Sequence, residues 1–428
     1  MPVRIVVGAN WGDEGKGRMV DYFARETDFV VRYQGGHNAG HTIVNDRGKF
    51  ALRLVPSGIF YPGVTNVVGP GAVVNLESLV GEIEKLCQRG VRIGPENLRI
   101  SDRSCVCFPF HVLQDKYEEE RLGKNKFGST VQGIAPVYGD RYLKYGVQVG
   151  LLRHPDMLRR QLERCLELKN LLFERVYEKP AVVLDEMCDW ADEYGRRLMP
   201  HVCDVTPVLN EAVAAGKRVL FEAQLGALRD VYFGIYPYVT SSSPLAAFAW
   251  VGGGLTLPAE TTTTAVVKAF ATCVGEGPFV TEIHGEAADR FRERTGEFGA
   301  ATGRPRRIGH FDAVATRYGV LMQGATEVAL TKLDDLSEQK TLQICTHYSI
   351  DGQKSTSFPL APELNAASPI YEEVEGWAAD IRSVRAYGDL PAAARAYVER
   401  IEHLIDVPIK FISVGPERDA LIRRAQAS

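Results

Sequence analysis

Short apolar runs alternate with amphipathic stretches along most of this chain. The runs are rich in β-branched residues, as buried strands are, and they fall within residues 5–7, 29–33, 66–76, 217–222, 328–330 and 411–415. Apolar residues at helical spacing occupy 19–23, 76–86, 155–178, 184–199 and 203–214. The pattern therefore predicts alternating strands and helices, with a helix-rich block at about 155–215 that serves as scaffold.

Other stretches depart from this pattern. Residues 115–126 and 286–295 are mostly charged; the first is predicted to be a solvated helix or a mobile segment, and the second an exposed helix. The threonine run at 261–264 is predicted to be a turn, and the glycine-rich stretch 296–307 a flexible loop. A further helix is predicted after the strand and loop at 411–415.

Composition is that of an ordinary globular protein. The chain has 428 residues, 45% hydrophobic and 24% charged, and its net charge of −4 does not favour a nucleic acid or a membrane as partner. No signal peptide or membrane-spanning stretch is seen, and the eight cysteines form neither a CxxC pair nor a zinc-type cluster. We expect a cytoplasmic enzyme with free thiols. Its length could hold several domains, but without a repeat or a linker we expect one catalytic domain over residues 1–428.

The first strand runs into a loop of the kind that binds phosphate. Backbone N–H groups, a helix N-terminus and a lysine act together on phosphate oxygens in such loops, and an acidic residue there can hold Mg²⁺ or act as a base. The loop is not a standard P-loop, because Asn10 stands where the first glycine belongs and Gly17 follows the lysine. The alternative is an ordinary turn with a solvated lysine. The loop contains Gly8, Gly12, Asp13, Glu14, Gly15, Lys16 and Gly17.

Three further loops have the composition of binding sites. Two histidines stand among glycines at 34–42, a Gly/Ser/Thr loop that could hold an anion spans 128–136, and several hydroxyls lie at 236–243. Arg304, Arg306 and Arg307 crowd the stretch 296–307, and the guanidinium fork can bind a carboxylate or a phosphate. Each loop alone could instead be structural or solvated.

A short motif near residue 331 favours guanine. Thr331-Lys332-Leu333-Asp334 follows a buried strand, and in such a motif the aspartate accepts hydrogen bonds from N1–H and the 2-amino group while the lysine packs over the ring. ATP is the alternative donor. Asp334 argues against it, because its carboxylate would face the acceptor N1 of adenine.

Taken together, these stretches closely resemble the adenylosuccinate synthetase family. The match covers nearly the whole chain in the right order, and the set of motifs is far more specific than any one of them. The motifs are WGDEGKG at 11–17, GGHNAGHT at 35–42, GSTVQGIAP at 128–136, YPYVTSS at 236–242, VGEGPF at 274–279, TGRPRR at 302–307, TKLD at 331–334 and ISVGP at 412–416.

The resemblance implies an α/β fold with a large, mainly parallel central sheet flanked by helices and small accessory segments. It implies GTP- and Mg²⁺-dependent joining of L-aspartate to C6 of IMP, by way of a 6-phosphoryl intermediate, in purine biosynthesis. Asp13 would take the N1 proton and hold Mg²⁺ with the backbone oxygen of Gly40. His41 would act on the bridging phosphate, and Lys16 would offset the charge of the transition state.

Binding roles follow the same resemblance. A homodimer is implied, in which Lys144 reaches the neighbouring site. GTP would be bound by Gly12, Asp13, Glu14, Gly15, Lys16, Gly17, Gly40, His41, Thr42, Lys332, Asp334, Ser413 and Gly415; the acceptor nucleotide by Asn38, Ser129, Thr130, Lys144, Leu225, Thr240 and Arg304; and aspartate by Val274, Thr302, Arg304 and Arg306.

Departures from the family pattern gather on the acceptor side. The family glutamine that contacts the purine falls on Leu225, with Gln224 displaced by one residue, and a family arginine falls on Lys144. A lost amide contact is worth roughly 1–3 kcal/mol when its partner stays buried, enough to change the preferred substrate. Further departures are Asn10, Val131, Gln132, Ser243, Pro244 and Ala301.

Three functions remain open at this point. The chain is a divergent enzyme for IMP, or it runs the same GTP and aspartate chemistry on an IMP-like or other heterocyclic acceptor, or it is a non-catalytic GTP-binding module. The combination of Asp13, Lys16 and His41 argues against the last, because binding alone needs no base.

Overall fold

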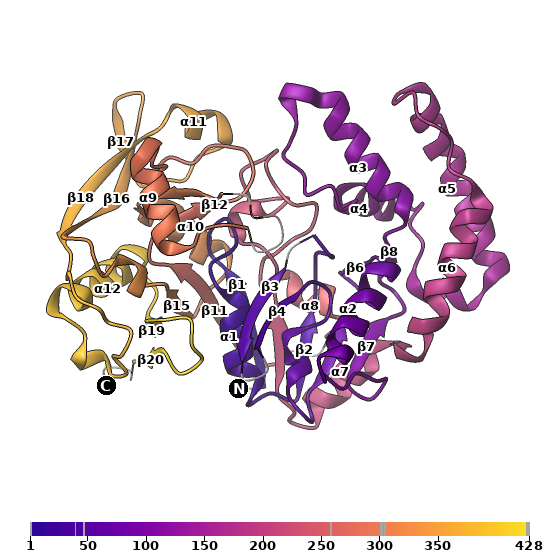
Figure 1. Ribbon diagram of the computed structural model, residues 1–428, viewed down its shortest axis with the longest axis horizontal. Coiled ribbons are helices and arrows are strands. Elements are labelled where there is room, and N and C mark those ends of the chain that lie inside the picture. The colour runs from indigo at the N-terminus through magenta and orange to yellow at the C-terminus, as the bar shows by residue number, and fades with distance from the viewer. Residues whose placement is uncertain are drawn as a thin grey trace.

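A ten-stranded sheet forms the centre of the molecule, in the order β20-β19-β15-β11-β1-β10-β2-β5-β7-β9 (Figure 1). The structure is a computed structural model that describes residues 2–38, 40–45, 48–256, 259–299, 303 and 305–424. Every neighbouring pair in the sheet is parallel except β19 with β20, which is antiparallel. The strands are β1 (Val3–Gly8), β2 (Phe29–Arg32), β5 (Thr65–Val68), β7 (Leu98–Ser101), β9 (Val202–Cys203), β10 (Val219–Glu222), β11 (Thr261–Lys268), β15 (Glu327–Thr331), β19 (Ile409–Ser413) and β20 (Leu421–Arg423).

Helices cover both faces of this sheet, as parallel strands require. Val6 of β1 packs in one cluster with Met19 and Val20 of α1 (Lys16–Ala24). Ile5, on the opposite face of the same strand, packs in the main core. That core includes residues of α7 (Val205–Ala214), α8 (Phe248–Gly253), α10 (Ala313–Met322) and α12 (Ala392–Ile405).

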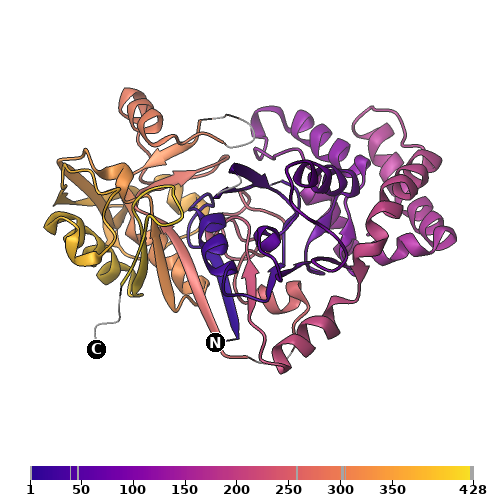
Figure 2. The ribbon, with the colours of Figure 1, turned by 60° about the horizontal axis from the view of Figure 1, so that its bottom comes forward.

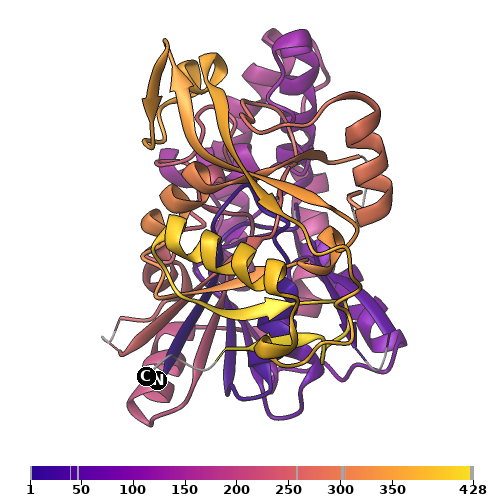
Figure 3. The ribbon, with the colours of Figure 1, turned by 90° about the vertical axis from the view of Figure 1, so that its left-hand side faces the viewer.

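Two lateral regions extend the sheet, and Figures 1 and 2 show them at opposite ends of it. One is helical and has its own core; it contains α2 (Leu76–Gln88), α3 (Pro109–Leu122), α4 (Ile134–Leu143), α5 (Pro155–Arg175) and α6 (Leu184–Leu198). The other is built on a small sheet of β14 (Phe311–Asp312), β16 (Thr341–Ile350), β17 (Gln353–Ser355) and β18 (Ser368–Glu375), with α11 (Ala361–Ala366). Figure 3 views the molecule from this second side, where α12 and the β16–β18 ribbon lie in front.

Short elements complete the fold around the edge of the sheet. None of the helices in the described part of the chain is long and apolar enough to cross a membrane. The remaining elements are β3 (His41–Asn45) with β4 (Gly48–Leu52), β6 (Val73–Val74) with β8 (Cys105–Val106), β12 (Ala271–Cys273) with β13 (Arg307–Gly309), and α9 (Gly285–Thr295). Short 3-10 turns are η1 (Ser57–Phe60), η2 (Gly123–Asn125), η3 (Val149–Arg153), η4 (Met199–His201), η5 (Ala227–Arg229), η6 (Asp334–Leu336) and η7 (Tyr387–Asp389).

The predicted mainly parallel α/β fold is confirmed, but two local predictions are wrong. The threonine run at 261–264 is the start of β11, which lies beside β1 at the centre of the sheet. β-branched threonines suit a strand, and Thr264 donates its hydroxyl to Glu327 at 2.7 Å, so burial costs it no hydrogen bond. The helix predicted after 411–415 is absent from the described residues up to 424, because the chain turns back as the antiparallel edge strand β20.

The two charged stretches, 115–126 and 286–295, are largely helical, in agreement with the helices predicted for them. Residues 115–126 belong largely to α3, which begins at Pro109 and buries Phe110, His111 and Asp115 on its inner face. Of the stretch 296–307, predicted as a flexible loop, the last residue, Arg307, begins β13.

Candidate active site

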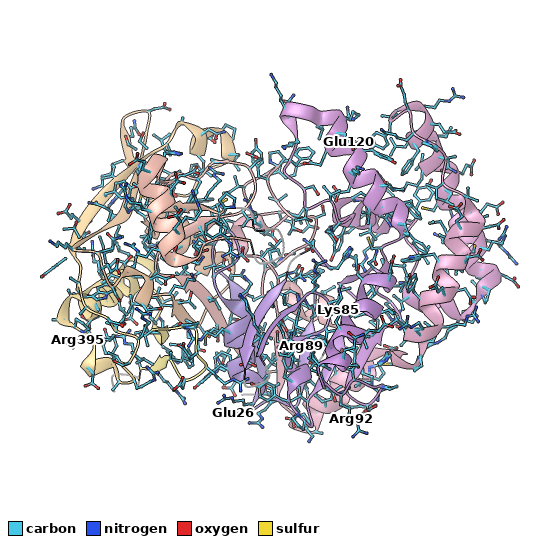
Figure 4. The ribbon with its side chains drawn as sticks, in the orientation of Figure 1. Glu26, Lys85, Arg89, Arg92, Glu120 and Arg395 are labelled. Atoms are coloured by element: carbon cyan, nitrogen blue, oxygen red, sulfur yellow. The ribbon has the colours of Figure 1, made fainter. Side chains whose placement is uncertain are left out.

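The predicted phosphate loop, His41 and the guanine motif lie at one edge of the central sheet. Parallel strands direct their carboxyl ends to the same edge, and the loops after β1, β2, β10, β15 and β19 all lie there. In Figure 1 this edge lies in the middle of the molecule, between the two lateral regions. Figure 4 places charged side chains such as Glu26 and Arg92 toward the bottom, at the other end of the sheet. The fold thus gathers segments far apart in sequence at one place.

The glycine-rich loop after β1 is held by its own carboxylate. Glu14 is buried and accepts hydrogen bonds from the backbone N–H of Asn10 at 3.1 Å and of Gly12 at 2.9 Å. The ammonium of Lys16 lies 2.5 Å from the same carboxylate. Glu14 therefore faces into the loop and fixes Lys16 at the first position of α1, where the helix N-terminus favours an anion.

Asp13 is the loop residue that faces outward. It adopts a left-handed conformation with φ of 59°, and about a third of its side chain is exposed. Its carboxylate lies 3.0 Å from Nε of Arg306. A non-glycine residue held in this conformation is common at functional sites, because the surrounding structure must impose it.

His41 is oriented by a buried glutamate. Its Nδ1 hydrogen-bonds Glu222 at the end of β10. Glu222 is fully buried and also accepts from the backbone N–H and the hydroxyl of Ser57, both at 2.8 Å, and lies 3.3 Å from Arg32.

The ionisation of this pair fixes which nitrogen of the histidine carries a proton. Burial alone would raise the pKa of Glu222, but Arg32 and His41 overcome it and lower that pKa to about 2. Burial, with Arg32, lowers the pKa of His41. An ionised Glu222 can only accept, so Nδ1 of His41 carries the proton and Nε2 is left for a ligand.

The predicted guanine site lies on the loops after β15 and β19. Asp334 accepts no side-chain hydrogen bond from any described residue; burial and the neighbouring Asp335 raise its pKa to about 6. The ammonium of Lys332 is anchored on Thr295, Asp335 and Glu297, which leaves its carbon stem to pack on a ring.

Arg18 of α1 joins this site to the phosphate loop. Its guanidinium donates to the hydroxyl of Ser413 and to the carbonyl of Gly415, and further to the carbonyls of Glu417 at 2.7 Å and Ala420 at 2.8 Å. One side chain thus fixes the whole turn that the guanine prediction requires.

Only part of the predicted aspartate site falls within the described residues. Arg306 lies between Asp13 and the buried Glu297, and its Nη1 is 2.6 Å from the Glu297 carboxylate. Val274 directly follows β12 and is half exposed. Arg307 is not free for a ligand, since it pairs with Glu282 and forms part of β13. Ala301, Thr302 and Arg304 lie outside the described residues.

The predicted acceptor side is built from neutral groups. Gln34 donates to the carbonyl of Gln224 at 2.8 Å and accepts from the hydroxyl of Ser242 at 2.8 Å. Gln224 in turn donates to the carbonyls of Gly36 at 2.7 Å and Arg53 at 3.1 Å. The displaced Gln224 is therefore a buried brace of the loop.

Leu225 stands next to this brace, against the phosphate loop. It has a positive φ of 58°, and it lies so close to Gly12 that a Cβ at Gly12 would be 3.3 Å from Cα and 3.4 Å from Cδ2 of Leu225. The next residue, Gly226, lies so near Asn10 that a Cβ at Gly226 would be 2.3 Å from the carbonyl oxygen of Asn10. An apolar side chain thus lies beside the loop that carries Asp13.

The other predicted acceptor residues are more exposed. Thr130 is exposed, and Ser129 is partly buried and accepts from the N–H of Val131 at 3.1 Å. The side-chain amide of Gln132 donates to carbonyls of its own loop. Asn38 accepts from the N–H of Gly36 at 3.3 Å. Thr240 is tied by its N–H to the carbonyl of Arg229 at 2.8 Å, and Lys144 is exposed at the end of α4.

Several residues that shape the site were not singled out in the sequence. They are Arg18, Arg32, Glu222, Arg229 and Glu297. A charged residue ending an apolar strand, as Glu222 does, was a signal that could have been used. The others carry no local signal, because their partners are distant in sequence.

A divalent cation would have to draw most of its ligands from substrate. No group of three or more His, Cys, Asp or Glu side chains suited to a metal occurs among the residues that the structure describes. Mg²⁺ takes one or two carboxylates together with phosphate and water oxygens, and the partly exposed Asp13 fits that requirement.

Comparison with known proteins identifies the family. The adenylosuccinate synthetase family model matches residues 5–422. The chain is 44% identical to adenylosuccinate synthetase of Caldanaerobacter subterraneus subsp. tengcongensis, covering 99% of each chain. It is 47% identical to adenylosuccinate synthetase 2 of Pseudoalteromonas translucida, covering 99% of this chain and 100% of the other.

Solved structures agree. The fully ligated adenylosuccinate synthetase from Plasmodium falciparum has a TM-score of 0.92 at 30% identity, with 99% of this chain and 100% of the other covered. Cyanophage S-2L succinoaminodeoxyadenylate synthetase, bound to dGMP and dATP, shares the fold with a TM-score of 0.60 at 18% identity, covering 98% of this chain and 95% of that one. With the converging loops described above, these matches show that the chain belongs to the adenylosuccinate synthetase family of GTP-dependent ligases.

Proposed function

We propose that this chain joins L-aspartate to C6 of IMP with GTP, giving adenylosuccinate, GDP and phosphate, through the residues assigned below. The observation that carries the assignment is the convergence of Asp13, Lys16, His41 and Arg306 with the guanine motif on one edge of the sheet. A binding module would have no need of the base and the oriented histidine together.

In this proposal one set of residues binds the guanine base of GTP and another binds its phosphates. Asp334 accepts from the guanine N–H groups while the stem of Lys332 covers the ring. Ser413 and Gly415 line the same pocket through the turn that Arg18 fixes. The phosphates meet the backbone of 12–17 and 40–42, and Lys16 exchanges Glu14 for a phosphate oxygen. Thr42 contributes here through its backbone.

The first chemical step is phosphoryl transfer to the 6-oxygen. Asp13 removes the N1 proton, so the electrons of that bond pass to O6, which attacks the γ-phosphorus while the β–γ bridging bond breaks and GDP leaves. For this, Asp13 must give up its pairing with Arg306. Nε2 of His41 faces the bridging oxygen and carries no proton in the free site. In the GTP complex His41 takes up a second proton there, with the ionised Glu222 stabilising the imidazolium through Nδ1, and that proton offsets the charge that develops.

The second step forms the C–N bond. The aspartate amine attacks C6, phosphate leaves with the C6–O6 electrons, and the amine proton is lost. Arg306, released from Asp13, holds a carboxylate of aspartate in bidentate fashion, with Val274 and, from outside the described residues, Thr302 and Arg304 beside it. Asn38, Ser129, Thr130, Thr240 and Arg304 bind the acceptor nucleotide.

Mg²⁺ is the cofactor that these residues fit. The free carboxylate oxygen of Asp13 and the backbone oxygen of Gly40 would hold it together with GTP phosphates. When bound, Mg²⁺ supplies positive charge to the phosphates. The chain itself supplies Lys16 and the N-terminus of α1 for the same purpose.

The working unit is a homodimer in the cytoplasm. All eight cysteines are free thiols, in keeping with a reducing compartment. Around Lys144 lies a group of exposed apolar side chains, and the hydroxyls of Tyr142 and Tyr232 hydrogen-bond within it. Such a group marks an interface, across which Lys144 reaches the partner's site. The group consists of Tyr142, Leu143, Tyr232, Phe233 and Tyr236, each at least half exposed.

One observation favours a second acceptor. Leu225 places an apolar side chain where the family has an amide, so an IMP-like or other 6-oxo heterocycle with an apolar edge would suit the site. The chemistry would be unchanged.

A phosphate-release assay with GTP, Mg²⁺ and L-aspartate tests both proposals, with products identified by mass. Aspartate-dependent formation of adenylosuccinate from IMP supports the primary function, with Asp13→Ala as the inactive control. No turnover of IMP, but aspartate-dependent turnover of another heterocycle, would establish the second acceptor. GTP binding without turnover of any acceptor would leave only a binding module.

A further inference from the structure

Glu297 is a fully buried carboxylate, two residues after α9, that three cations share. Its Oε1 lies 2.7 Å from the ammonium of Lys332 and 3.0 Å from that of Lys268, and its Oε2 lies 2.6 Å from Nη1 of Arg306. Its backbone is fixed too, since its N–H donates to Arg292 and its carbonyl accepts from Arg306. One carboxylate thus contacts both the predicted guanine loop and the predicted aspartate loop.

The charges around Glu297 alternate across the site. Asp13 pairs with Arg306, Arg306 with Glu297, Glu297 with Lys332, and Lys332 with Asp335 at 2.9 Å. The line runs from the phosphate loop, through the aspartate loop, to the turn that carries Asp334. Glu297 at its centre is fully buried and the other members are partly exposed, so a ligand can replace a partner only outside that centre.

Lys268 braces the middle of this line from the sheet. It is buried at the end of β11 and also donates to the hydroxyl of Thr272 at 2.7 Å. The three cations hold the pKa of Glu297 well below its ordinary range although burial opposes this, so the carboxylate stays ionised wherever the protein is folded. Removing a partner of such a buried charge is far more costly than removing a surface pair.

We propose that Glu297 is a positioning residue that couples the guanine-nucleotide site to the aspartate site. The inference rests on the proposed function, because it takes Lys332 as the residue under the base and Arg306 as the residue on aspartate. A bound base presses on the stem of Lys332 and fixes its ammonium on Oε1. The same carboxylate then holds Arg306 in one orientation through Oε2. In that orientation Arg306 can exchange Asp13 for the carboxylate of the substrate.

Coupling of this kind is reciprocal. If the guanine nucleotide strengthens aspartate binding by some factor, aspartate strengthens nucleotide binding by the same factor. The coupling predicts that loss of Glu297 weakens binding of both the guanine nucleotide and aspartate and leaves binding of the acceptor nucleotide unaffected. Among the described residues, no contact of Glu297 reaches the loops after β2 or β10.

The test measures the dissociation constant of a fluorescent GDP analogue with and without saturating L-aspartate, in the presence of Mg²⁺ and phosphate. In the wild type we expect aspartate to tighten GDP binding by about fivefold or more. In Glu297→Gln the ratio of the two dissociation constants, without and with aspartate, should fall close to one. The KM values for GTP and aspartate should rise, while the KM for the acceptor should be unchanged. Glu282→Gln is the matched control, because it breaks the neighbouring Arg307 pair without touching the alternating line.

A second variant keeps the test decisive if Glu297→Gln does not fold. Asp335→Asn removes the partly exposed outer partner of Lys332, and it should lower the ratio without abolishing it. A ratio of one in the wild type, an unchanged ratio in a folded Glu297→Gln, or an equal loss in Glu282→Gln would each overturn the coupling. If the coupling fails in one of these ways but the wild-type enzyme still ligates aspartate, the proposed function stands. A wild-type enzyme that is inactive on every acceptor would overturn the proposed function itself.

Discussion

The two halves of the candidate site are held together by different chemistry. In the donor half, formed by the loops after β15 and β19 with residues 295–299 and 305–307, the loops are held by ion pairs centred on Glu297 and Lys332 and by the hydrogen bonds of the Arg18 guanidinium. In the acceptor half, formed by the loops after β2 and β10, the buried braces are the amides of Gln34 and Gln224. The exception in the acceptor half is the ionised Glu222, which pairs with Arg32 and accepts from Nδ1 of His41.

The difference matches what each half binds. A buried charge whose partner is another side chain can exchange that partner for a charged ligand at little net cost, as Lys16 and Arg306 are placed to do. Neutral amides such as those of Gln34 and Gln224 have no charged partner to exchange for a ligand, but their hydrogen bonds fix the shape of the loops that they join. The donor half is thus poised to respond to its ligands, whereas the acceptor half discriminates by fit.

Asp13 sits where the halves meet, so its loss should have the largest effect. Asp13→Asn keeps the size of the side chain but cannot take the N1 proton, and we expect kcat to fall by roughly 10³-fold or more. Steady-state kinetics and binding of a GDP analogue check this. The control Asp28→Asn, on the surface between α1 and β2, should leave kcat unchanged. Loss of nucleotide binding in step with kcat would show a structural role instead.

Glu222→Gln removes the buried carboxylate that pairs with Arg32 and His41 in the acceptor half. The amide oxygen can still accept from Nδ1 of His41, but it carries no charge to stabilise a second proton on the imidazole, and Arg32 is left buried without its carboxylate. We therefore expect about a 10²-fold fall in kcat and a lower Tm. Ser57→Ala removes one neighbour of Glu222 without altering its charge, and it should cost far less. Equal kcat in Glu222→Gln and the wild type would remove His41 from the mechanism.

Asp334→Asn tests the charge logic of the donor half. A guanine contact to an ionised acceptor is worth about 1.5–3 kcal/mol, so KM for GTP should rise roughly 10- to 100-fold and discrimination against ATP should weaken. Asp335→Asn, one residue on, should leave the base preference in place. Unmoved nucleotide preference in Asp334→Asn would contradict the assigned role.

The same residue predicts a pH dependence. The pKa of Asp334 is raised to about 6, and only the ionised form accepts two N–H groups, so guanine affinity is present above that pKa and lost as the pH falls through it. We expect binding of the GDP analogue to weaken by roughly an order of magnitude between pH 7 and pH 5. The phosphates titrate in the same range, so Asp334→Asn serves as reference: the part due to Asp334 must vanish in it.

Leu225→Gln should have the smallest effect, and it tests the acceptor half. Restoring an amide beside Gly12 should lower KM for IMP by a few fold if IMP is a poor fit for the present site, with GTP and aspartate constants unchanged. Lys144→Arg, at the exposed end of α4, is a companion that should act only in the dimer. A rise in KM for IMP in Leu225→Gln would show that the site is already matched to IMP.

Local sequence was enough for much of the fold and for the residues that follow strands directly. The apolar runs predicted β1, β2, β10, β15 and β19 because parallel strands are buried on both faces. The predicted phosphate loop and the TKLD motif lie in contiguous residues at the ends of such strands, so the sheet brings them together without further information. Their functional roles remain predictions.

Only the tertiary structure decided what holds those residues in place. His41 and its partner Glu222 are 181 residues apart, and Arg18 and Ser413 are 395 apart. The threonine run of β11 was predicted as a turn because its strand neighbours are distant in sequence, and one of them, β15, supplies Glu327 as the partner of the Thr264 hydroxyl. Partners so distant leave no period or spacing in the chain, and a buried charge such as Glu297 can be recognised only once the groups that neutralise it have been brought around it.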